Sequence, residues 1–507
     1  MERNKNYPPL MSSMDTQNAE VATESIFPKV VSSGLWVLTG NVLNRILGFI
    51  KTVILARLLS PADFGLFGIA MLVLGSLDQF TKSGVEEALI QKKKVIEQYL
   101  NVAWTINILR GLVIFILVYL LAPYAAHFFK NEQADPVIKT ISLILILQAL
   151  YNIGIVHLQK DLSFKKLFFY RFSGSLADFI VAISVAIVLK NVWALICGLL
   201  VGHYTRLVVS YLIYPYRPTP KLDFTVAREI LKFGGWITAI GIIAFLVAQG
   251  DDAVVGRVLG ATSLGFYYLA FLIASLPLSE IRLLLSPIAL PAYAKMSDDI
   301  NRLKEGYLRV LQMTAFVVTP AGIGLFLLAP EFTLIILGQK WQPIILPLQI
   351  LAIAGIITSF VTTGSSLFYA SGWPKIEFEI QSMRLIALAC IIYPFTLKWN
   401  ITGTALAVTI SSAIVIPIWL FRLIRITGAK LIDFLRKLSP IFIASGIMYI
   451  GVLALKNSFY IISIVKFVVL VVFGMFIYFL TLFIIWHFFK IGPLKELQSI
   501  FNIRSTK

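Results

Sequence analysis

Residues 56–70 read ARLLSPADFGLFGIA, and residues 256–270 read GRVLGATSLGFYYLA. The two strings align without a gap at an offset of 200 positions, and the alignment extends over residues 31–73 and 231–273. The identical pairs are Gly34 and Gly234, Trp36 and Trp236, Arg57 and Arg257, Leu59 and Leu259, Gly65 and Gly265, Ala70 and Ala270, and Leu72 and Leu272. Chance similarity of two apolar helices is the alternative, but Arg and Gly matched at the ends of apolar runs favour an internal duplication.

The composition around this repeat is that of a membrane protein. The chain has 507 residues, of which 58% are hydrophobic and 14% are charged, and its mean hydropathy is +0.85. Soluble domains are about half apolar and about a quarter charged. A soluble enzyme, a disordered scaffold and a secreted disulfide scaffold are therefore excluded, and we expect an all-α polytopic membrane protein.

Long apolar runs recur from end to end and predict about fourteen transmembrane helices. Their expected limits are 33–57, 63–83, 100–122, 137–157, 168–189, 192–214, 231–250, 263–287, 308–329, 343–370, 376–398, 401–424, 438–456 and 460–489.

The basic residues predict the orientation. With the N-terminus inside, 29 of the 44 Lys and Arg residues fall on the cytoplasmic side, nine on the opposite side and six within spans. This is the positive-inside pattern, and it accounts for most of the net charge of +18. We expect a multi-pass membrane protein with both termini in the cytoplasm, and no nucleic-acid partner is needed.

Six spans separate the two copies of the repeat, so both copies insert the same way up. Such parallel repeats are related by an axis along the membrane normal, with the substrate at their interface. We therefore expect two pseudo-symmetric six-helix lobes around a central cavity, plus two C-terminal helices. The expected divisions are a disordered cytoplasmic tail over 1–30, an N-lobe over 31–216, a C-lobe over 217–430, and spans 13 and 14 with a cytoplasmic tail over 431–507.

Charged residues deep inside spans are costly and usually face a bundle interior or water. Eleven are predicted here: Arg45, Lys51, Asp78, Arg110, Asp178, Arg206, Asp251, Asp252, Glu280, Arg282 and Arg384. Ion pairing between helices, and snorkelling of Arg206, Arg282 and Arg384, are the structural alternatives.

The first span is the most informative helix. Its polar residues fall within one arc of a helix, and they are Asn41, Asn44, Arg45, Gly48, Lys51 and Thr52. A stripe of this kind lines an aqueous path or a polar seam buried between helices. Glu377, Gln381 and Arg384 form a second stripe at helical spacing. We predict a cavity whose substrate-binding residues are Arg45, Arg110, Asn41, Asn44, Gln381, Arg384, Arg206 and Arg282.

The repeat places Lys51 and Thr52 opposite Asp251 and Asp252. This predicts that Lys51 pairs with one of these carboxylates across the lobe interface and closes an outer gate; helix capping by the two Asp residues is the alternative. The residues predicted to act in gating or ion coupling are Lys51, Asp251, Asp252, Asp78, Asp178 and Glu280.

No cofactor or metal site is expected. Cys197 and Cys390 lie in apolar runs, the four His residues are scattered, and the chain has no phosphate-binding loop of the GxxxxGK[ST] type. The predicted outer loops are short, which leaves little room for the catalytic site of a polymerase or ligase.

Several segments resemble one family. They are residues 56–65, ALIQ at 88–91, Asp251-Asp252 with GRVLG at 256–260, and GQKWQP at 338–343. They resemble signatures of bacterial polysaccharide exporters, and the chain is especially similar to colanic-acid and teichuronic-acid exporters. Their order and spacing run from about residue 30 to residue 440. The wider superfamily also holds multidrug efflux proteins and the lipid II flippase.

The resemblance implies a flippase of the bacterial cytoplasmic membrane and not an enzyme. It implies alternating access and a substrate of undecaprenyl-diphosphate-linked oligosaccharide for lipopolysaccharide, capsule or exopolysaccharide synthesis. Membrane lipids, a polysaccharide polymerase and glycosyltransferases of the same pathway are the expected partners. A multidrug or cation antiporter, a lipid II flippase and, less favoured, a membrane polymerase or ligase are the alternatives.

Overall fold

The computed structural model describes residues 36, 39–81, 97–161, 163–296, 298–458, 463–489 and 492–493, without the side chains of 97–98, 159–160, 226–240, 278–288 and 489. The expected tail over 1–30 and the side chains of Glu280 and Arg282 lie outside this part of the chain.

The described chain is helical, because a backbone in hydrocarbon must satisfy its own hydrogen bonds. A first helix covers residues 39–58. It is followed by α2 (Pro61–Phe80), α4 (Glu97–Phe128), α5 (Ala134–Ile141), α6 (Leu143–Ala149), α7 (Ile155–Lys160), α8 (Phe164–Leu189), α9 (Trp193–Ile213), α10 (Phe224–Met296), α11 (Ile300–Glu331), η1 (Phe332–Leu337), η2 (Gln339–Ile344), α12 (Ile345–Ala370), α13 (Pro374–Ile414), α14 (Ile416–Thr427), α15 (Leu431–Ser458) and α16 (Ile464–Phe489).

Ten helices in the described chain are long and apolar enough to cross a membrane. The expected all-α polytopic membrane fold is thereby confirmed. Both α10 and α13 contain two predicted spans, which meet at Gly260 in α10 and at Trp399 and Asn400 in α13. Gly260 has a φ of 84°, a value that glycine adopts without strain.

Two predicted spans are not among those ten helices. One lies on the first helix, which carries the polar stripe. The other, predicted over 137–157, is shorter than expected, because α6 ends at Ala149 and a turn leads into α7. Buried Asn152 fixes this turn: its side chain donates to the carbonyls of Ser210, Tyr214 and Tyr216 and accepts from the Gly154 amide.

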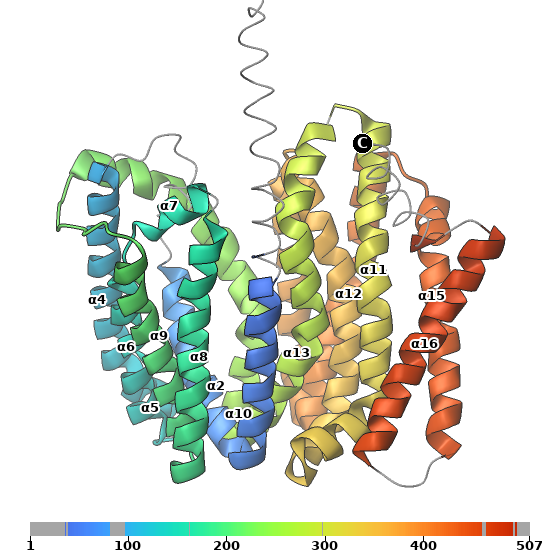
Figure 1. Ribbon diagram of the computed structural model, residues 1–507, viewed down its shortest axis with the longest axis horizontal. Coiled ribbons are helices and arrows are strands. Elements are labelled where there is room, and N and C mark those ends of the chain that lie inside the picture. Colours follow the sequence, from blue (N-terminus) through green and yellow to red (C-terminus); the bar gives the residue numbers. More distant parts are fainter. Residues whose placement is uncertain are drawn as a thin grey trace, which may run out of the picture.

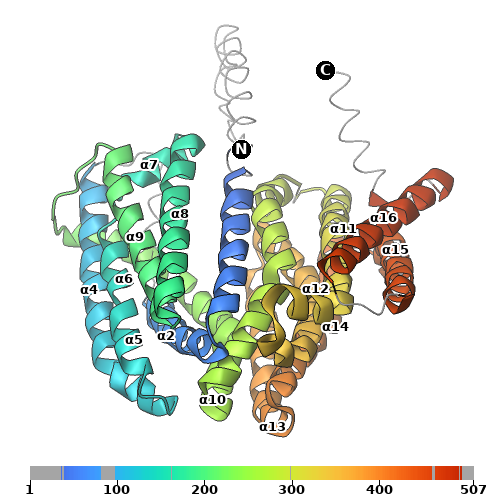
Figure 2. The same ribbon diagram turned by 60° about the horizontal axis from the view of Figure 1, so that its bottom comes forward.

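The helices form two groups side by side (Figure 1). The group containing α4 to α9 lies on the left, and the group containing α11 to α13 lies on the right, with α15 and α16 at its far edge. The first helix (blue) stands between α8 and the right-hand group in both views (Figures 1 and 2). Along the chain, the predicted division at 216 and 217 falls between α9 and α10.

The repeated segments meet where the two groups join. An ideal Cβ on Gly65 would lie 1.7 Å from the Ala261 carbonyl oxygen, and one on Gly265 would lie 1.8 Å from the Pro61 carbonyl oxygen. These contacts are reciprocal at an offset of 200 residues, as two equivalent surfaces around a pseudo-twofold axis require. The duplicated glycines therefore let α2 and α10 pack with their backbones touching.

The start of α2 explains the SPAD motif. The Ser60 side chain accepts from the Asp63 amide at 3.3 Å, and Asp63 accepts from the Ser60 amide at 2.9 Å. Pro61 occupies the first turn. Together they form a capping box, which begins α2 at the close contact with α10.

Candidate functional site

The polar stripe of the first helix faces protein at Lys51. Its ammonium nitrogen lies 2.6 Å from an Asp178 carboxylate oxygen on α8, and both side chains are more than four-fifths buried. The apolar residues Val42, Ile46 and Ile50 are exposed on another face of this helix. At Lys51, the structure therefore favours the polar seam between helices.

The predicted pair of Lys51 with Asp251 or Asp252 is wrong for this structure, because Lys51 binds Asp178 within its own half of the chain. The repeat nevertheless has a structural meaning. Lys51 and Asp178 lie on the first and fifth predicted spans of one half, and Asp251 and Arg384 lie on the equivalent spans of the other. In the first half, the basic residue lies on the first span and the acidic residue on the fifth. In the second half, the acidic residue lies on the first span and the basic residue on the fifth.

The other members of the stripe are half-buried. The Asn44 amide nitrogen donates to the Gly40 carbonyl at 2.8 Å, and its side-chain oxygen is buried without a hydrogen-bond partner among the described residues. Asn41 and Arg45 are half-buried on the same helix. An ideal Cβ at Gly48 would meet nothing within 4 Å, so the stripe borders open space at that level.

Arg110 has a structural partner set that sequence analysis did not foresee. Its guanidinium donates to the carbonyls of Asp78 and Thr81, at 2.7 and 2.8 Å, and lies 2.6 Å from the Asp78 carboxylate. These carbonyls are at the C-terminal end of α2, where a cation satisfies unpaired acceptors. Arg110 therefore caps α2 and pairs with Asp78.

Arg206 belongs to a polar cluster between α8 and α9. It donates to the Ser175 hydroxyl at 3.1 Å, and its chain fills the space beside Gly174, where a Cβ would lie 2.3 Å from it. Nearby, the Tyr151 hydroxyl and His203 Nδ1 are 2.6 Å apart. The aromatic pair was not identified from the sequence, because its members are 52 residues apart.

A buried acidic cluster occupies α10 and α13. The Tyr267 hydroxyl donates to the Asp251 carboxylate at 2.6 Å, and Asp251 and Asp252 are 1% and 5% exposed. Gln381 donates to Glu377 at 2.7 Å. Arg384 interacts electrostatically with both Asp251 and Glu377, so one guanidinium faces two carboxylates of this cluster.

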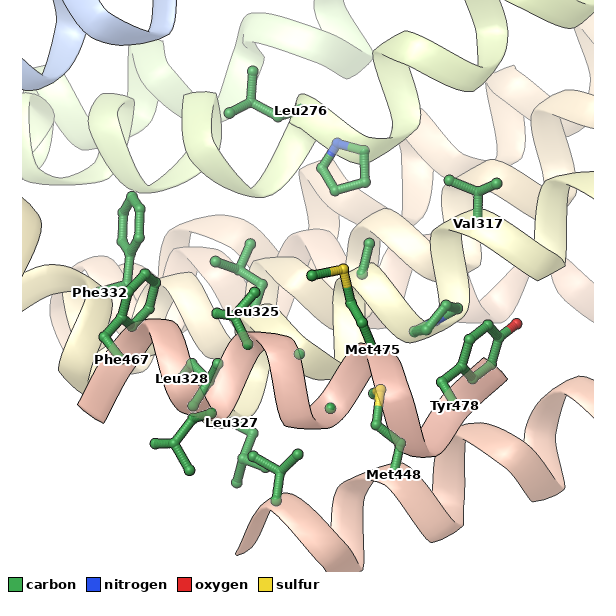
Figure 3. A pocket seen from close by; sticks show the side chains of 18 of the residues that line it. Leu276, Val317, Leu325, Leu327, Leu328, Phe332, Met448, Phe467, Met475 and Tyr478 are labelled. Carbon is green, nitrogen blue, oxygen red and sulfur yellow. The ribbon is translucent and has the colours of Figure 1, made fainter. Parts of the chain in front are cut away.

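A cavity of about 520 Å³ lies between α10, α11, α15 and α16 (Figure 3). Its lining is almost entirely apolar and includes Leu276, Met475 and Tyr478. Phe49 of the first helix also lines it, two residues before Lys51. None of the predicted substrate-binding residues with a described side chain lines this cavity, so the central cavity between the lobes remains a prediction.

Within the described chain, no group of three or more His, Cys, Asp or Glu residues is arranged to hold a metal ion. The charged groups instead form mixed clusters with Lys, Arg, Tyr and Gln side chains. Charged side chains at membrane depth usually pair with one another in this way.

The fold defines a class: the chain is an all-α polytopic membrane protein. The fold of the lipid II flippase MurJ in its inward closed conformation matches with a TM-score of 0.74 and 18% identity, over 89% of this chain and 99% of that one. An inward-facing multidrug resistance MATE family transporter of the MOP superfamily matches with a TM-score of 0.63 and 13% identity, over 76% and 95% of the two chains.

The chain belongs to the polysaccharide biosynthesis protein family, whose sequence profile matches residues 54–346. It is 27% identical to the lipopolysaccharide biosynthesis protein WzxC of Escherichia coli K12, over 71% of this chain and 74% of the relative. It is 24% identical to the teichuronic acid biosynthesis protein TuaB of Bacillus subtilis 168, over 71% and 75%. An uncharacterized membrane protein in the cps region of Klebsiella pneumoniae is 27% identical, over 90% and 95%.

Proposed function

We propose that the protein is an exporter, without enzymatic activity, that moves lipid-linked oligosaccharide units across the bacterial cytoplasmic membrane. The substrate is an oligosaccharide on undecaprenyl diphosphate, carried from the inner to the outer leaflet for lipopolysaccharide, capsule or exopolysaccharide synthesis. Family membership supports this proposal. The names of WzxC and TuaB refer to lipopolysaccharide and teichuronic acid biosynthesis, and another relative is named as the succinoglycan biosynthesis transport protein ExoT.

One observation carries the proposal. Phe49 lines the apolar cavity, and Lys51 on the same helix belongs to a charged seam. A lipid-linked sugar needs both environments at once, since its polyprenyl chain is apolar and its diphosphate is anionic. The cavity gains little over lipid in hydrophobic free energy, because acyl chains are equally apolar. The proposed role of the cavity is to keep the polyprenyl chain in apolar surroundings while the diphosphate and sugar cross the membrane.

The remaining roles follow the chemistry of the side chains. We assign Arg45 to offset the diphosphate charge, and Asn41, Asn44 and Gln381 to hydrogen-bond the sugar. Arg206, Arg282 and Arg384 are proposed to add positive potential along the path. For Arg110 the structure shows capping of α2, so its contribution is proposed to be indirect.

Ion coupling is proposed for the acidic cluster. Asp251 and Asp252 are both buried, and Asp251 and Glu377 share the Arg384 guanidinium, so a proton or a small cation would balance the remaining negative charge. Asp178, Asp78 and Glu280 are the other proposed coupling residues. Lys51 would act through its pair with Asp178.

The proposed arrangement places both termini in the cytoplasm, with an N-lobe over 31–216, a C-lobe over 217–430 and an appendage over 431–507. The substrate and membrane lipids are the proposed ligands, and a polymerase and glycosyltransferases of the same pathway are the proposed neighbours.

Filling the cavity tests the function. Gly324 lines the cavity, and a Cβ there meets nothing within 4 Å, so Gly324→Phe starts from an open position and adds a ring to the cavity lining. Gly446 on α15 is equally open but does not line the cavity, which makes Gly446→Phe the matched control. In a host lacking its own exporter, surface polysaccharide is measured by immunoblot and lipid-linked intermediates by mass spectrometry.

We expect the wild type and Gly446→Phe to restore surface polysaccharide. Gly324→Phe should cut it about tenfold, equivalent to about 1.4 kcal/mol, with lipid-linked intermediates accumulating inside. Equal export by the two variants would remove the cavity from the pathway. Drug resistance without any polysaccharide export by the wild type would support the antiporter alternative and overturn the proposed substrate.

A further inference from the structure

Four helix ends meet where α2 and α10 touch, at the lower end of the molecule in Figure 1. The basic residues predict that this end faces outward, and we refer to it as the outer end. Here Arg57, the last-turn arginine of the first helix, reaches from one half of the chain to the other. Its guanidinium donates to the carbonyls of Ile335 and Ile336 in η1, the latter at 2.7 Å.

Arg257 makes the corresponding contact in the opposite direction. It lies in α10 just before the break at Gly260, and its guanidinium donates to the Phe128 carbonyl at the end of α4. The guanidinium carbon also lies 5.0 Å from the centre of the Phe128 ring. One contact therefore runs from the first half to the second, and the other runs back.

The two arginines are equivalent by sequence. Arg57 and Arg257 are the matched pair of the 200-residue repeat, and α4 and α11 are the third predicted spans of their halves. Each arginine therefore binds the C-terminal end of the third span in the other half. Such ends carry unsatisfied carbonyls and a partial negative charge, so a guanidinium is a chemically suitable partner.

A third contact strengthens one side of this arrangement. The Lys340 ammonium donates to the carbonyls of Arg57 and Leu59 at 2.8 and 2.7 Å, and the Trp341 indole donates to the Ala56 carbonyl at 2.8 Å. The end of the first helix is thus capped by the other half of the chain. Trp341 is fully buried and lies edge-on to Phe64 of α2 and Phe266 of α10, with ring centres 5.3 and 5.8 Å away.

We propose that Arg57, Arg257 and Lys340 form an outer latch that holds the two lobes together and must release before substrate can leave outward. Arg57 and Arg257 are exposed, so water can replace their carbonyl partners when the lobes separate. This suits a contact that opens in every cycle better than a deeply buried ion pair would. The latch rests on the proposed alternating access, and it replaces the predicted gate between Lys51 and Asp251 or Asp252.

Cysteine labelling tests the latch without requiring transport. In full-length protein with Cys197→Ser and Cys390→Ser, the reporter is Leu59→Cys, because Leu59 is fully buried at the latch. Intact cells are treated with a membrane-impermeant maleimide, and the labelling rate is normalised to a separate Lys190→Cys reporter, which is exposed at the outer end. The variants are Arg57→Ala, Arg257→Ala, the double variant and Lys340→Met.

Loss of one charge-assisted contact should increase the labelling rate of the Leu59→Cys reporter about tenfold, and the double variant should label faster still. Arg57→Lys should fall between wild type and Arg57→Ala, because lysine keeps the positive charge but lacks the planar fork of donors with which the guanidinium binds the two adjacent carbonyls. Lys398→Ala is the matched control: Lys398 is exposed at the same end and lies over the adjacent Trp399 ring. It should label like the wild type.

Unchanged labelling in the double variant would overturn the latch, including the case in which its melting temperature falls, since that result would mean the contacts only stabilise the fold. The proposed function can fail separately. Faster labelling in variants of a protein that exports no polysaccharide would keep the latch and reject the substrate.

Discussion

Lys51 illustrates which properties of a charged residue in a membrane helix can be predicted from the sequence and which cannot. Helical spacing predicts that Lys51 lies deep in the membrane and on a polar stripe. It does not predict the partner of Lys51, because Asp178 lies 127 residues away. The two side chains meet only because the first helix packs beside α8. The alignment of Lys51 with Asp251 correctly marked equivalent positions, but equivalent positions need not touch.

A charge exchange distinguishes these two partners. Lys51→Asp alone should reduce export and the free energy of unfolding, because it leaves two carboxylates buried together; losing one member of a buried pair costs roughly 3 kcal/mol. The double variant Lys51→Asp with Asp178→Lys should recover most of both. Export and thermal unfolding in detergent are the measurements.

The matched control is Lys51→Asp with Asp251→Lys, which should not recover. Recovery by this control instead of the first double variant would restore the inter-lobe pair predicted from the repeat.

Most helices were predictable from the sequence, because apolar runs of membrane length mark where helices must form. Where they end depends on single side chains. Asn152 ends one span early by satisfying three carbonyls of the segment from Ser210 to Tyr216. The apolar cavity was not predictable, since four helices and Phe49 create it together and none of them has an unusual sequence.

The backbone contact between α2 and α10 leads to a second prediction. Gly65→Ala would force its Cβ onto the Ala261 carbonyl oxygen, and backbone cannot move aside as a flexible side chain does. We expect α2 and α10 to separate, with loss of folded protein measured by size-exclusion chromatography and thermal unfolding. Gly265→Ala should behave in the same way, because its contact with Pro61 is the reciprocal one.

Gly68→Ala is the control on the same helix. A Cβ there would make an ordinary contact of 3.5 Å with Leu264, so its stability should stay near that of the wild type. Equal tolerance of Ala at Gly65 and Gly68 would mean that the repeated glycines do not set the helix approach.

For the whole molecule, the arrangement of the helices in two groups (Figure 1) is consistent with the repeat, but the chemistry within it was only partly predictable. Arg110 and Arg206 were expected in a substrate path. Arg110 instead caps α2, and Arg206 binds Ser175 between α8 and α9. Sequence identifies a buried charge; only the packed helices show how much of it is already neutralised.

The distribution of the net charge of +18 leads to a final prediction, which concerns the orientation of the whole molecule in the membrane. If its asymmetry sets orientation, the two parallel halves must insert alike. Lys190 and Lys398 are exposed at the outer ends of α8 and of the first part of α13, and Lys166 and Lys375 are exposed near the starts of the same helices. Single cysteines at these four positions, in protein with Cys197→Ser and Cys390→Ser, are treated with an impermeant maleimide. Positions 190 and 398 should label in intact cells, and positions 166 and 375 only after permeabilisation.

Opposite labelling results in the two halves would contradict the parallel duplication. The reverse labelling result in both halves would keep the duplication but invert the orientation of the molecule, which would place the proposed latch on the cytoplasmic side.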